Sequence, residues 1–350
     1  MTDEQGSAGA FVPLLSRRAE ESGHTVITLG DPLVDDYLTF VGARCRPNTL
    51  LAVASDLKAF FAVTGKSPRD VHSKDVFDFI EHQRRPRRGP TVVRIEDGER
   101  GLSARTIRRR LSSVSGLFAY LALRDDVVAK NPVPRGLATR LARSGRRSRT
   151  VPLIRTPRTL PRVCSPADVN ALMQALRTQR DRAMVECMLL GGLRRCEVLG
   201  LRLQDVSVGE RRVFVADGKG GAQRLVPVAG RFFGTLGRYL QQERPPESPT
   251  DQVFVVLKGQ RRGQPLSSAG LDEIISGARR RAGIERLTCH QLRHTCFTRL
   301  REAGMSLEAI QAQAGHRSIE STRIYLHLAN DWLAAEYLRA IDVIEGAAVS

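Results

Sequence analysis

The feature that most constrains the fold of this 350-residue chain is a basic segment, residues 135–160, that has no apolar face. It is rich in arginine, proline, serine and glycine, and residues 144–149 read Ser-Gly-Arg-Arg-Ser-Arg. A segment of this kind is typical of a linker between domains. Since the chain is long enough for two domains, we expect a helical domain over residues 31–134 and a second domain over residues 161–350. Residues 1–30 show little periodicity and are expected to form an N-terminal arm, either mobile or a short helix.

Apolar side chains recur at the spacing of a helix throughout the first domain. One stripe lies in residues 34–41 and another in residues 50–61, and a third helix is expected over residues 73–83. A fourth helix is predicted to start after Ser103, whose hydroxyl suits an N-cap, with apolar positions on one face from residue 107 to residue 121. These patterns predict a helical first domain.

The second domain is predicted to combine helices with a small sheet. Helices are expected over residues 166–202 and 267–344. Residues 212–215 and 225–228 have the pattern of strands around a glycine-rich turn, which predicts a hairpin, and residues 253–256 add a short strand. The fold class expected for the whole chain is mostly α with a small antiparallel β-sheet.

The charge of the chain indicates a polyanionic partner. The formal net charge is +18, and arginine dominates the basic residues. The planar guanidinium suits phosphate oxygens, so nucleic acid is favoured over the alternative of a basic protein that binds none. The arginines expected to contact DNA lie in a proline-broken loop, in the first turns of the fourth helix and in the linker: Arg84, Arg85, Arg87, Arg88, Arg105, Arg108, Arg109, Arg146 and Arg147. A solvated loop without function is the alternative for the first group.

Several classes of protein are disfavoured. No apolar run approaches the ~18 residues of a membrane span, and the acidic N-terminus is unlike a signal peptide. The six scattered cysteines are typical of reduced cytosolic thiols, so we expect a cytoplasmic, nucleoid-associated protein with no membrane partner. Four residues look superficially like zinc ligands, namely Cys289, His290, His294 and Cys296. On one helix they would point to different faces, so we expect neither a metal site nor a cofactor.

The second domain also holds the groups that break a phosphodiester without a metal ion. The transition state needs fixed cations for its negative charge, an acid for the leaving oxygen and a nucleophile. Tyrosine can be that nucleophile, and the resulting phosphotyrosine keeps the energy of the ester bond for rejoining. His290, Arg293 and His294 fall at i, i+3 and i+4 and can share one face of a helix. A solvated helix face is the alternative for this triplet alone.

In order and spacing these motifs resemble the tyrosine recombinases, also called the phage integrase family. The matching motifs are Gly-Leu-Arg-x-x-Glu at residues 192–197, Gly-Lys-Gly-Gly at 218–221, His-x-x-Arg-His at 290–294, Gly-His-x-Ser at 315–318, and Tyr325. The resemblance covers the whole second domain. Less specifically, residues 31–132 are similar to the helical core-binding domain of the family. It implies a SAM-like DNA-binding domain and a catalytic domain that form a clamp around DNA.

The resemblance implies a role for each matched residue. Arg194 and Arg293 would clamp the scissile phosphate, and Lys219 would protonate the leaving 5′ oxygen. Tyr325 would attack the phosphorus and form a 3′-phosphotyrosyl bond.

The remaining matched residues would assist these four. His290 would act as general base or orient the phosphate, and His316 would hydrogen-bond the phosphate. Glu197 would support the catalytic residues without contacting the substrate, and His294 would be structural. Arg195 and Cys196 stand where the family usually has an aliphatic and a small residue, and neither is assigned a catalytic role.

The family resemblance predicts a site-specific recombinase of the integrase or transposase type. Such an enzyme recombines double-stranded DNA at inverted-repeat sites through a Holliday junction, here for integration or excision of a mobile element. The apolar stripe over residues 332–344 resembles a C-terminal helix that docks on a neighbouring protomer in a homotetramer, although packing on its own domain is the alternative. An accessory directionality factor is a possible further partner.

Three alternatives remain open. An Xer-like resolvase of chromosome or plasmid dimers is disfavoured by the extended basic loop at residues 84–101, and the short N-terminal arm argues against a lambda-type architecture. A type IB topoisomerase uses similar residues but does not exchange strands between two duplexes. A DNA-binding regulator with an inactive site is disfavoured because the catalytic set is complete.

Overall fold

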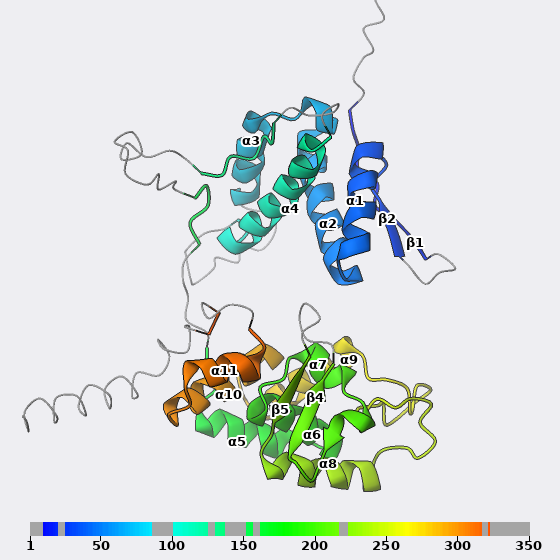
Figure 1. The fold of residues 1–350 in the computed structure, drawn as a ribbon, viewed down its shortest axis with the longest axis vertical. Helices are drawn as coiled ribbons and strands as arrows, with labels where there is room; N and C mark the ends of the chain where they lie inside the picture. The colour runs from blue at the N-terminus through cyan, green and yellow to red at the C-terminus, as the bar shows by residue number, and fades with distance from the viewer. Residues whose placement is uncertain are drawn as a thin grey trace, which may run out of the picture. The chain divides into compact units, whose positions relative to one another are not determined.

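The computed structural model describes residues 10–19, 25–85, 101–124, 130–136, 152–156, 162–216, 223–316 and 321–322. The chain forms two compact units, Met1–Arg158 and Thr159–Ser350. Helices dominate both, and the described strands form two small antiparallel sheets (Figure 1). The predicted fold class, mostly α with a small antiparallel sheet, is confirmed.

The first unit contains the following described elements: β1 (Ser16–Ala19), β2 (Thr25–Thr28), α1 (Pro32–Arg44), α2 (Pro47–Thr64), a 3-10 turn η1 (Pro68–Asp70), α3 (Ser73–Arg84) and α4 (Ala104–Ala122). Local signals set the helix starts. The Asp31 carboxylate accepts from two backbone amides of the first turn of α1, and the Ser103 hydroxyl accepts from Thr106 N in α4. The apolar stripes meet in a core where Phe60 packs edge-on against Phe79 and Phe118.

The described part of the segment expected as an N-terminal arm, residues 1–30, contains a pair of strands in place of a mobile segment or a short helix. Strand β1 pairs antiparallel with β2, with Ser16 opposite Thr28. Ile27 and Leu29 are buried in the same core as the helices. Two strands of four residues are too short to give a clear periodic signal. Strand β2 packs against α1 and α2, whereas β1 is exposed and is held by its pairing with β2.

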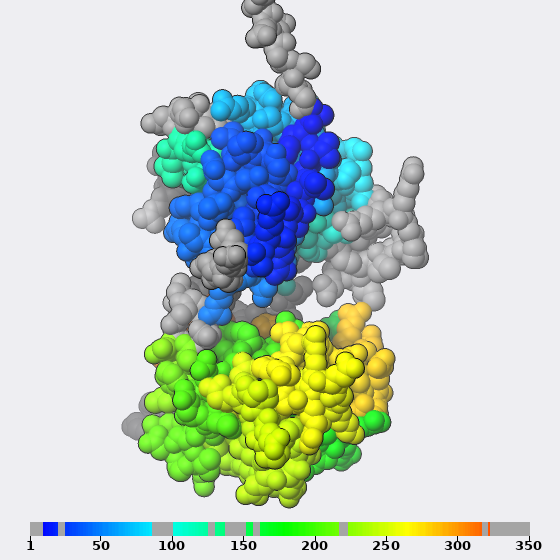
Figure 2. Space-filling view, turned by 90° about the vertical axis from the view of Figure 1, so that its right-hand side faces the viewer, coloured from blue at the N-terminus to red at the C-terminus, as the bar shows by residue number. Residues whose placement is uncertain are grey.

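The second unit contains these described elements: α5 (Pro166–Ala175), α6 (Gln179–Leu190), α7 (Arg195–Gly200), a 3-10 turn η3 (Leu203–Asp205), β3 (Val206–Ser207), β4 (Arg212–Val215), β5 (Arg224–Pro227), α8 (Gly230–Gln242), α9 (Ser268–Arg281), α10 (Cys289–Glu302) and α11 (Leu307–Ala314). The sheet order is β3-β4-β5, and Val215 lies opposite Arg224. Helix α6 is buried along most of its length and packs against α8 and α10. In the space-filling view the chain between α8 and α9, yellow-green to yellow, covers one face of this unit (Figure 2).

The strand predicted over residues 253–256 does not join the sheet. Val255 makes only an isolated bridge to Pro265. Its amide donates to the Tyr239 hydroxyl, and that hydroxyl donates to the carbonyl of Val253. The apolar run reflects burial of an irregular segment. Tyr239 bonds two of its backbone groups, and backbone groups of Leu201, Gln264, Gly263 and Leu266 bond others, so no regular strand pairing is needed.

Some predicted residues lie outside the described part of the chain. They are Lys219, Tyr325, Arg87, Arg88, Arg146 and Arg147, together with the C-terminal segment 323–350. Among the helices that the structure does describe, none has the length and apolar character needed to cross a membrane.

Candidate active site

Arg293 occupies the interior of the site, in the second turn of α10, and is only 2% exposed. A buried guanidinium needs acceptors for its donors. Arg293 donates to the carbonyl of Gly192 and, at 2.7 Å, to that of Ala314. Its Nη2 lies 3.3 Å from Nε2 of His316, and its guanidinium stacks over the Phe297 ring with 4.8 Å to the centroid. The alternative of a solvated helix face is therefore wrong for this residue.

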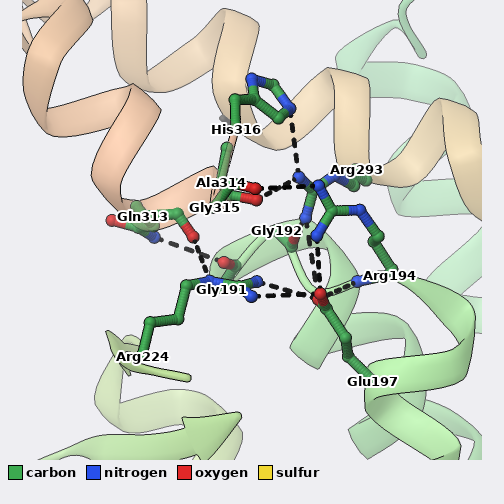
Figure 3. A network of polar contacts seen from close by, with 10 residues as sticks. All are labelled: Gly191, Gly192, Arg194, Glu197, Arg224, Arg293, Gln313, Ala314, Gly315 and His316. Carbon is green, nitrogen blue, oxygen red and sulfur yellow. Dashed lines mark hydrogen bonds and ion pairs between the residues drawn. The ribbon is translucent and has the colours of Figure 1, made fainter. Parts of the chain in front are cut away.

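Glu197 lies beneath the arginines in the first turn of α7, with a completely buried side chain. Its carboxylate accepts from the backbone N of Arg194 at 2.8 Å and from Arg194 Nη1 at 2.7 Å. It also accepts from both terminal nitrogens of Arg224, at 3.1 and 2.9 Å, and Nη1 of Arg293 lies 3.9 Å from Oε2. Three guanidinium groups from α10, β5 and the start of α7 thus converge on one carboxylate (Figure 3).

The charge state of this cluster follows from its contacts. Burial alone would raise the pKa of the Glu197 carboxyl, but hydrogen bonds and positive charge from Arg224 and Arg194 outweigh it and lower the pKa to about 2. The carboxylate is therefore ionised at neutral pH. Three cations around one anion leave an excess of positive charge, which suits the binding of a phosphate.

Arg194 presents this charge to solvent. Its side chain is 20% exposed, and its Nη2 donates to the carbonyl of Gly315 at 3.4 Å. A cavity of about 620 Å³ opens beside it. The charged and polar groups that line the cavity include Arg194, Arg195, Arg279, Arg293, His290 and the single carboxylate of Asp272. Because arginines outnumber the carboxylate in this lining, the cavity attracts anions.

His316 lies just beyond the end of α11. Burial comes first, and the charges of Arg293, Arg194 and Arg224 add to it, in lowering the pKa of His316 to about 4. The ring is therefore neutral at pH 7. Since arginine can only donate, Nε2 accepts from Arg293, and the protonated Nδ1 donates to the Thr322 hydroxyl, 3.0 Å away.

His290 and His294 lie one turn apart on α10, with ring centroids 4.2 Å apart in an edge-to-face arrangement. Burial, followed by the charge of Arg293 and of Arg194, lowers the pKa of the His290 imidazole. Burial, with the charges of His290, Arg293 and His316, lowers the pKa of His294 to about 4. A neutral His290 on the exposed side of the helix is able to accept a proton.

Two motif glycines allow the backbone to approach this cluster. Gly192 has φ +67°, and a Cβ there would lie 2.4 Å from the Phe297 ring. Gly315 has φ +61° and ends α11, and a Cβ there would lie 3.0 Å from Nη1 of Arg224. The left-handed backbone and the close contacts together explain why glycine suits both positions.

Arg224 is the site residue that the sequence analysis missed. A charged residue at the start of a hairpin strand usually faces solvent, and the residue itself carries no signal of burial. In the structure its side chain is 10% exposed and its guanidinium points at Glu197. The proximity of β5 to the start of α7 is a tertiary property, so only the fold reveals it.

The predicted DNA-contacting arginines of the first unit differ in their surroundings. Arg105 and Arg108 are exposed in the first turns of α4, and Arg108 lies 3.3 Å from the Thr156 hydroxyl. Arg109 is paired at 2.5 Å with Asp56, a carboxylate that is 1% exposed and is also approached by Arg110. Arg109 therefore has a structural partner in addition to any DNA contact.

The arginines at the end of α3 are more exposed. Arg84 is the last residue of the helix, and Arg85 pairs with Glu81 at 2.9 Å on its surface. Four residues of α10 resemble zinc ligands in the sequence, namely Cys289, His290, His294 and Cys296. Within the part of the chain that the structure describes, they form no group able to hold a metal ion.

Comparison with known proteins accounts for both units. The model of the phage integrase family matches residues 162–331, and that of the phage integrase N-terminal SAM-like domain matches residues 34–125. Tyrosine recombinase XerD of Pseudomonas aeruginosa is 33% identical over 315 residues, 86% of this chain and 94% of that protein. XerD of Listeria monocytogenes is 28% identical over 316 residues, 85% of this chain and 94% of that protein. The Tn1549 transposon integrase, solved in complex with transposon right end DNA, aligns with a TM-score of 0.64 at 20% identity, covering 88% of this chain and 99% of that one. This last likeness shows the shared fold.

Proposed function

This chain belongs to the phage integrase family of tyrosine recombinases and is a site-specific DNA recombinase, and on this premise we propose that Tyr325 is its nucleophile. The other proposed catalytic residues are Arg194, Lys219, His290, Arg293 and His316. The observation that carries the proposal is the cluster around Glu197, which fixes two of these arginines and brings His316 beside one of them. This is the positive, pre-ordered environment that a phosphodiester transition state needs.

The proposed reaction follows from the groups present. Arg194 and Arg293 bind the non-bridging oxygens of the scissile phosphate. Neutral His290 accepts the proton of the Tyr325 hydroxyl as the new O–P bond forms. Lys219 gives a proton to the 5′ oxygen as the old P–O bond breaks. The product is a 3′-phosphotyrosyl bond with a free 5′ hydroxyl. Attack by a 5′ hydroxyl reverses the step without ATP because the ester energy is retained.

The proposed biological reaction is integration or excision of a mobile element. In this proposal four copies of the chain assemble on two inverted-repeat sites in double-stranded DNA, through the C-terminal segment, and pass through a Holliday junction. In this proposal the recombination takes place at the nucleoid, in the cytoplasm, and an accessory factor determines whether integration or excision occurs. The likeness to a transposon integrase bound to transposon end DNA supports this assignment. The cationic cavity beside Arg194 is where the backbone that flanks the scissile phosphate would lie.

A second candidate function is an Xer-like resolvase of chromosome or plasmid dimers. It is favoured by the similarity to two XerD proteins, each covered over 94% of its length. The two functions differ in substrate. Mobile-element recombination uses sites at the ends of the element, whereas dimer resolution uses one site present in each copy of the replicon. Recombination assays with both kinds of site separate them.

Covalent trapping tests the proposed chemistry. Purified protein with a chelator is mixed with nicked DNA fragments that span the flanks of its own gene and, separately, candidate replicon sites. The expected result is a protein–DNA adduct on a denaturing gel, absent in Tyr325→Phe. Binding to a footprinted site without any adduct would instead favour a regulator with an inactive site. Cleavage without strand exchange between two duplexes would favour a topoisomerase.

A further inference from the structure

Arg224 joins two parts of the site that carry different proposed catalytic residues. Its two terminal nitrogens donate to the two oxygens of Glu197, at 3.1 and 2.9 Å. Its Nε donates at 2.9 Å to the carbonyl of Gln313 in the last turn of α11. All three guanidinium nitrogens therefore have partners within the protein. The bidentate pair with the carboxylate also fixes the orientation of the plane.

The partners of Arg224 are the groups that hold the proposed phosphate ligands. Glu197 Oε1, which accepts from Arg224, also accepts from Arg194 at 2.7 Å. Gln313 lies two residues before Gly315, whose carbonyl accepts from Arg194. The next residue along the chain is His316. Figure 3 shows Arg224 below the arginine pair, between Glu197 and the end of α11.

Close packing makes this connection stiff. A Cβ on Gly315 would lie 3.0 Å from Nη1 of Arg224, so the guanidinium is in contact with the turn that precedes His316. The side chain of Gln313 donates in turn to the carbonyl of Gly191, at 3.4 Å. A displacement of the guanidinium therefore moves both the carboxylate and the end of α11.

From these contacts we propose that Arg224 is a positioning residue for DNA cleavage, which locks Glu197 to the end of α11 and so holds Arg194 and His316 in register with the scissile phosphate. The inference rests on the proposed function of those residues. Arg224 does not touch the substrate in this proposal, because, unlike Arg194 and Arg293, it does not line the cationic cavity. Its Nε, Nη1 and Nη2 donate to groups of the protein. Its effect is transmitted through Glu197 and the Gln313 carbonyl.

The test compares Arg224→Met and Arg224→Lys with wild type and a matched control, Arg202→Lys. Arg202 pairs with Asp251 at 3.2 Å on the surface of the same unit, so it reproduces the same chemical change away from the site. Three quantities are measured: the affinity for the nicked site, the melting temperature, and the rate of adduct formation at saturating DNA. A second substrate carries sulfur in place of the scissile 5′ bridging oxygen, and this thiolate leaves without a proton.

At saturating DNA, Arg224→Met is expected to form adduct about 100-fold more slowly, the scale of a 1 Å misplacement of catalytic groups. DNA affinity stays within about twofold because phosphate contacts elsewhere dominate binding. Arg224→Lys recovers only part of the rate, since an ammonium cannot bridge the carboxylate and the Gln313 carbonyl with a fixed plane. Arg202→Lys cleaves like wild type.

The sulfur substrate identifies the route of the effect. The Arg224→Met defect is expected to persist on it, because the misplaced groups are those that bind the phosphate. Lys219→Ala, by contrast, should regain its rate of adduct formation on this substrate, since this variant lacks only the general acid, which a thiolate leaving group does not need. Recovery of Arg224→Met would overturn the proposal, because it would mean that this arginine serves the proposed general acid, Lys219.

Other outcomes would also overturn it. Cleavage by Arg224→Met at the wild-type rate would refute the role directly, and loss of folding in both Arg224 variants would assign the residue to stability alone. The failure of the proposed function is distinguishable: in that case wild-type protein itself forms no Tyr325-dependent adduct on any site.

Discussion

Nη2 of Arg293 lies 3.3 Å from Nε2 of His316, although 23 residues separate the two in the chain. The contact joins the middle of α10 to the turn that ends α11. It also fixes a tautomer: a guanidinium only donates, so the imidazole facing it is neutral and carries its proton on Nδ1. Arg293 and His316 thus hold each other in place before substrate binds, and His316 would have to exchange a hydrogen-bond partner to donate to a phosphate oxygen.

The stability of the protein should fall as the pH falls from about 6.5 to about 4. His294 and His316 each have a pKa of about 4 in the folded protein, against 6.5 for an unperturbed histidine. Between these values the unfolded chain binds protons that the folded chain does not, so acid favours unfolding. Urea titrations at several pH values measure the slope. His294→Gln should flatten it, whereas His82→Gln, on the exposed surface of α3, serves as the control. A slope unchanged in His294→Gln would contradict this assignment.

Removing the charge of Glu197 should destabilise the protein strongly. Glu197→Gln leaves buried guanidinium groups without their carboxylate, and breaking a buried ion pair in this way costs roughly 3–5 kcal/mol. The free energy of unfolding in urea measures the change. Asp251→Asn, which removes the surface partner of Arg202, should cost less than about 1 kcal/mol. Equal losses of unfolding free energy in Glu197→Gln and Asp251→Asn would show that the buried ion pairs of Glu197 stabilise the protein no more than a surface pair does.

A methyl group at position 192 should disturb both the fold and the site. In Gly192→Ala the alanine would have to adopt φ +67°, and its Cβ would lie 2.4 Å from the Phe297 ring. We therefore expect the free energy of unfolding to fall by roughly 1–3 kcal/mol. Adduct formation should fall as well, because the Gly192 carbonyl accepts from Arg293. Gly200→Ala meets no atom within 4 Å and is the matched control, for which near-wild-type values are expected.

The two arginines Arg105 and Arg109 on α4 should behave differently. Arg105→Ala is expected to weaken DNA binding and reduce the salt dependence of log K by about 0.9, as for the loss of one phosphate contact, with no change in melting temperature. Arg109→Ala should lower the melting temperature, because Asp56 loses its nearest cation while remaining buried. Binding isotherms at several salt concentrations and thermal melts distinguish the two. A melting temperature unaffected by Arg109→Ala would show that the ion pair is not structural.

The parts of the fold that were predictable from sequence are those set by local interactions. Helices α2 and α4 are predicted by their apolar stripes, and Ser103 caps the first turn of α4 as expected. The grouping of His290, Arg293 and His294 follows from helical spacing alone. Local pattern could not assign strand β1, whose structure depends on pairing with β2. Nor could it assign residues 253–256, whose backbone bonds to Tyr239 and to the backbone of segments distant in the chain.

The site divides in the same way. The motif residues could be named from their order, but their convergence could not be derived from it. The sequence was equally compatible with Arg293 on a solvated helix face, and its burial is explained by partners that the fold supplies, among them the carbonyls of Gly192 and Ala314. Arg224 had no local signal, because its partners on α7 and α11 are 27 and 89 residues away in the chain.

The convergence of three guanidinium groups on Glu197 also bears on the safety of the reaction. They come from β5, from α10 and from the start of α7, so no single element of the unit can form the cluster alone. In the proposed mechanism, a nascent or damaged copy that lacks any one of these elements cannot gather the charge that opens a phosphodiester. On this proposal folding precedes activity, and a copy that has not completed folding is expected to leave DNA uncut.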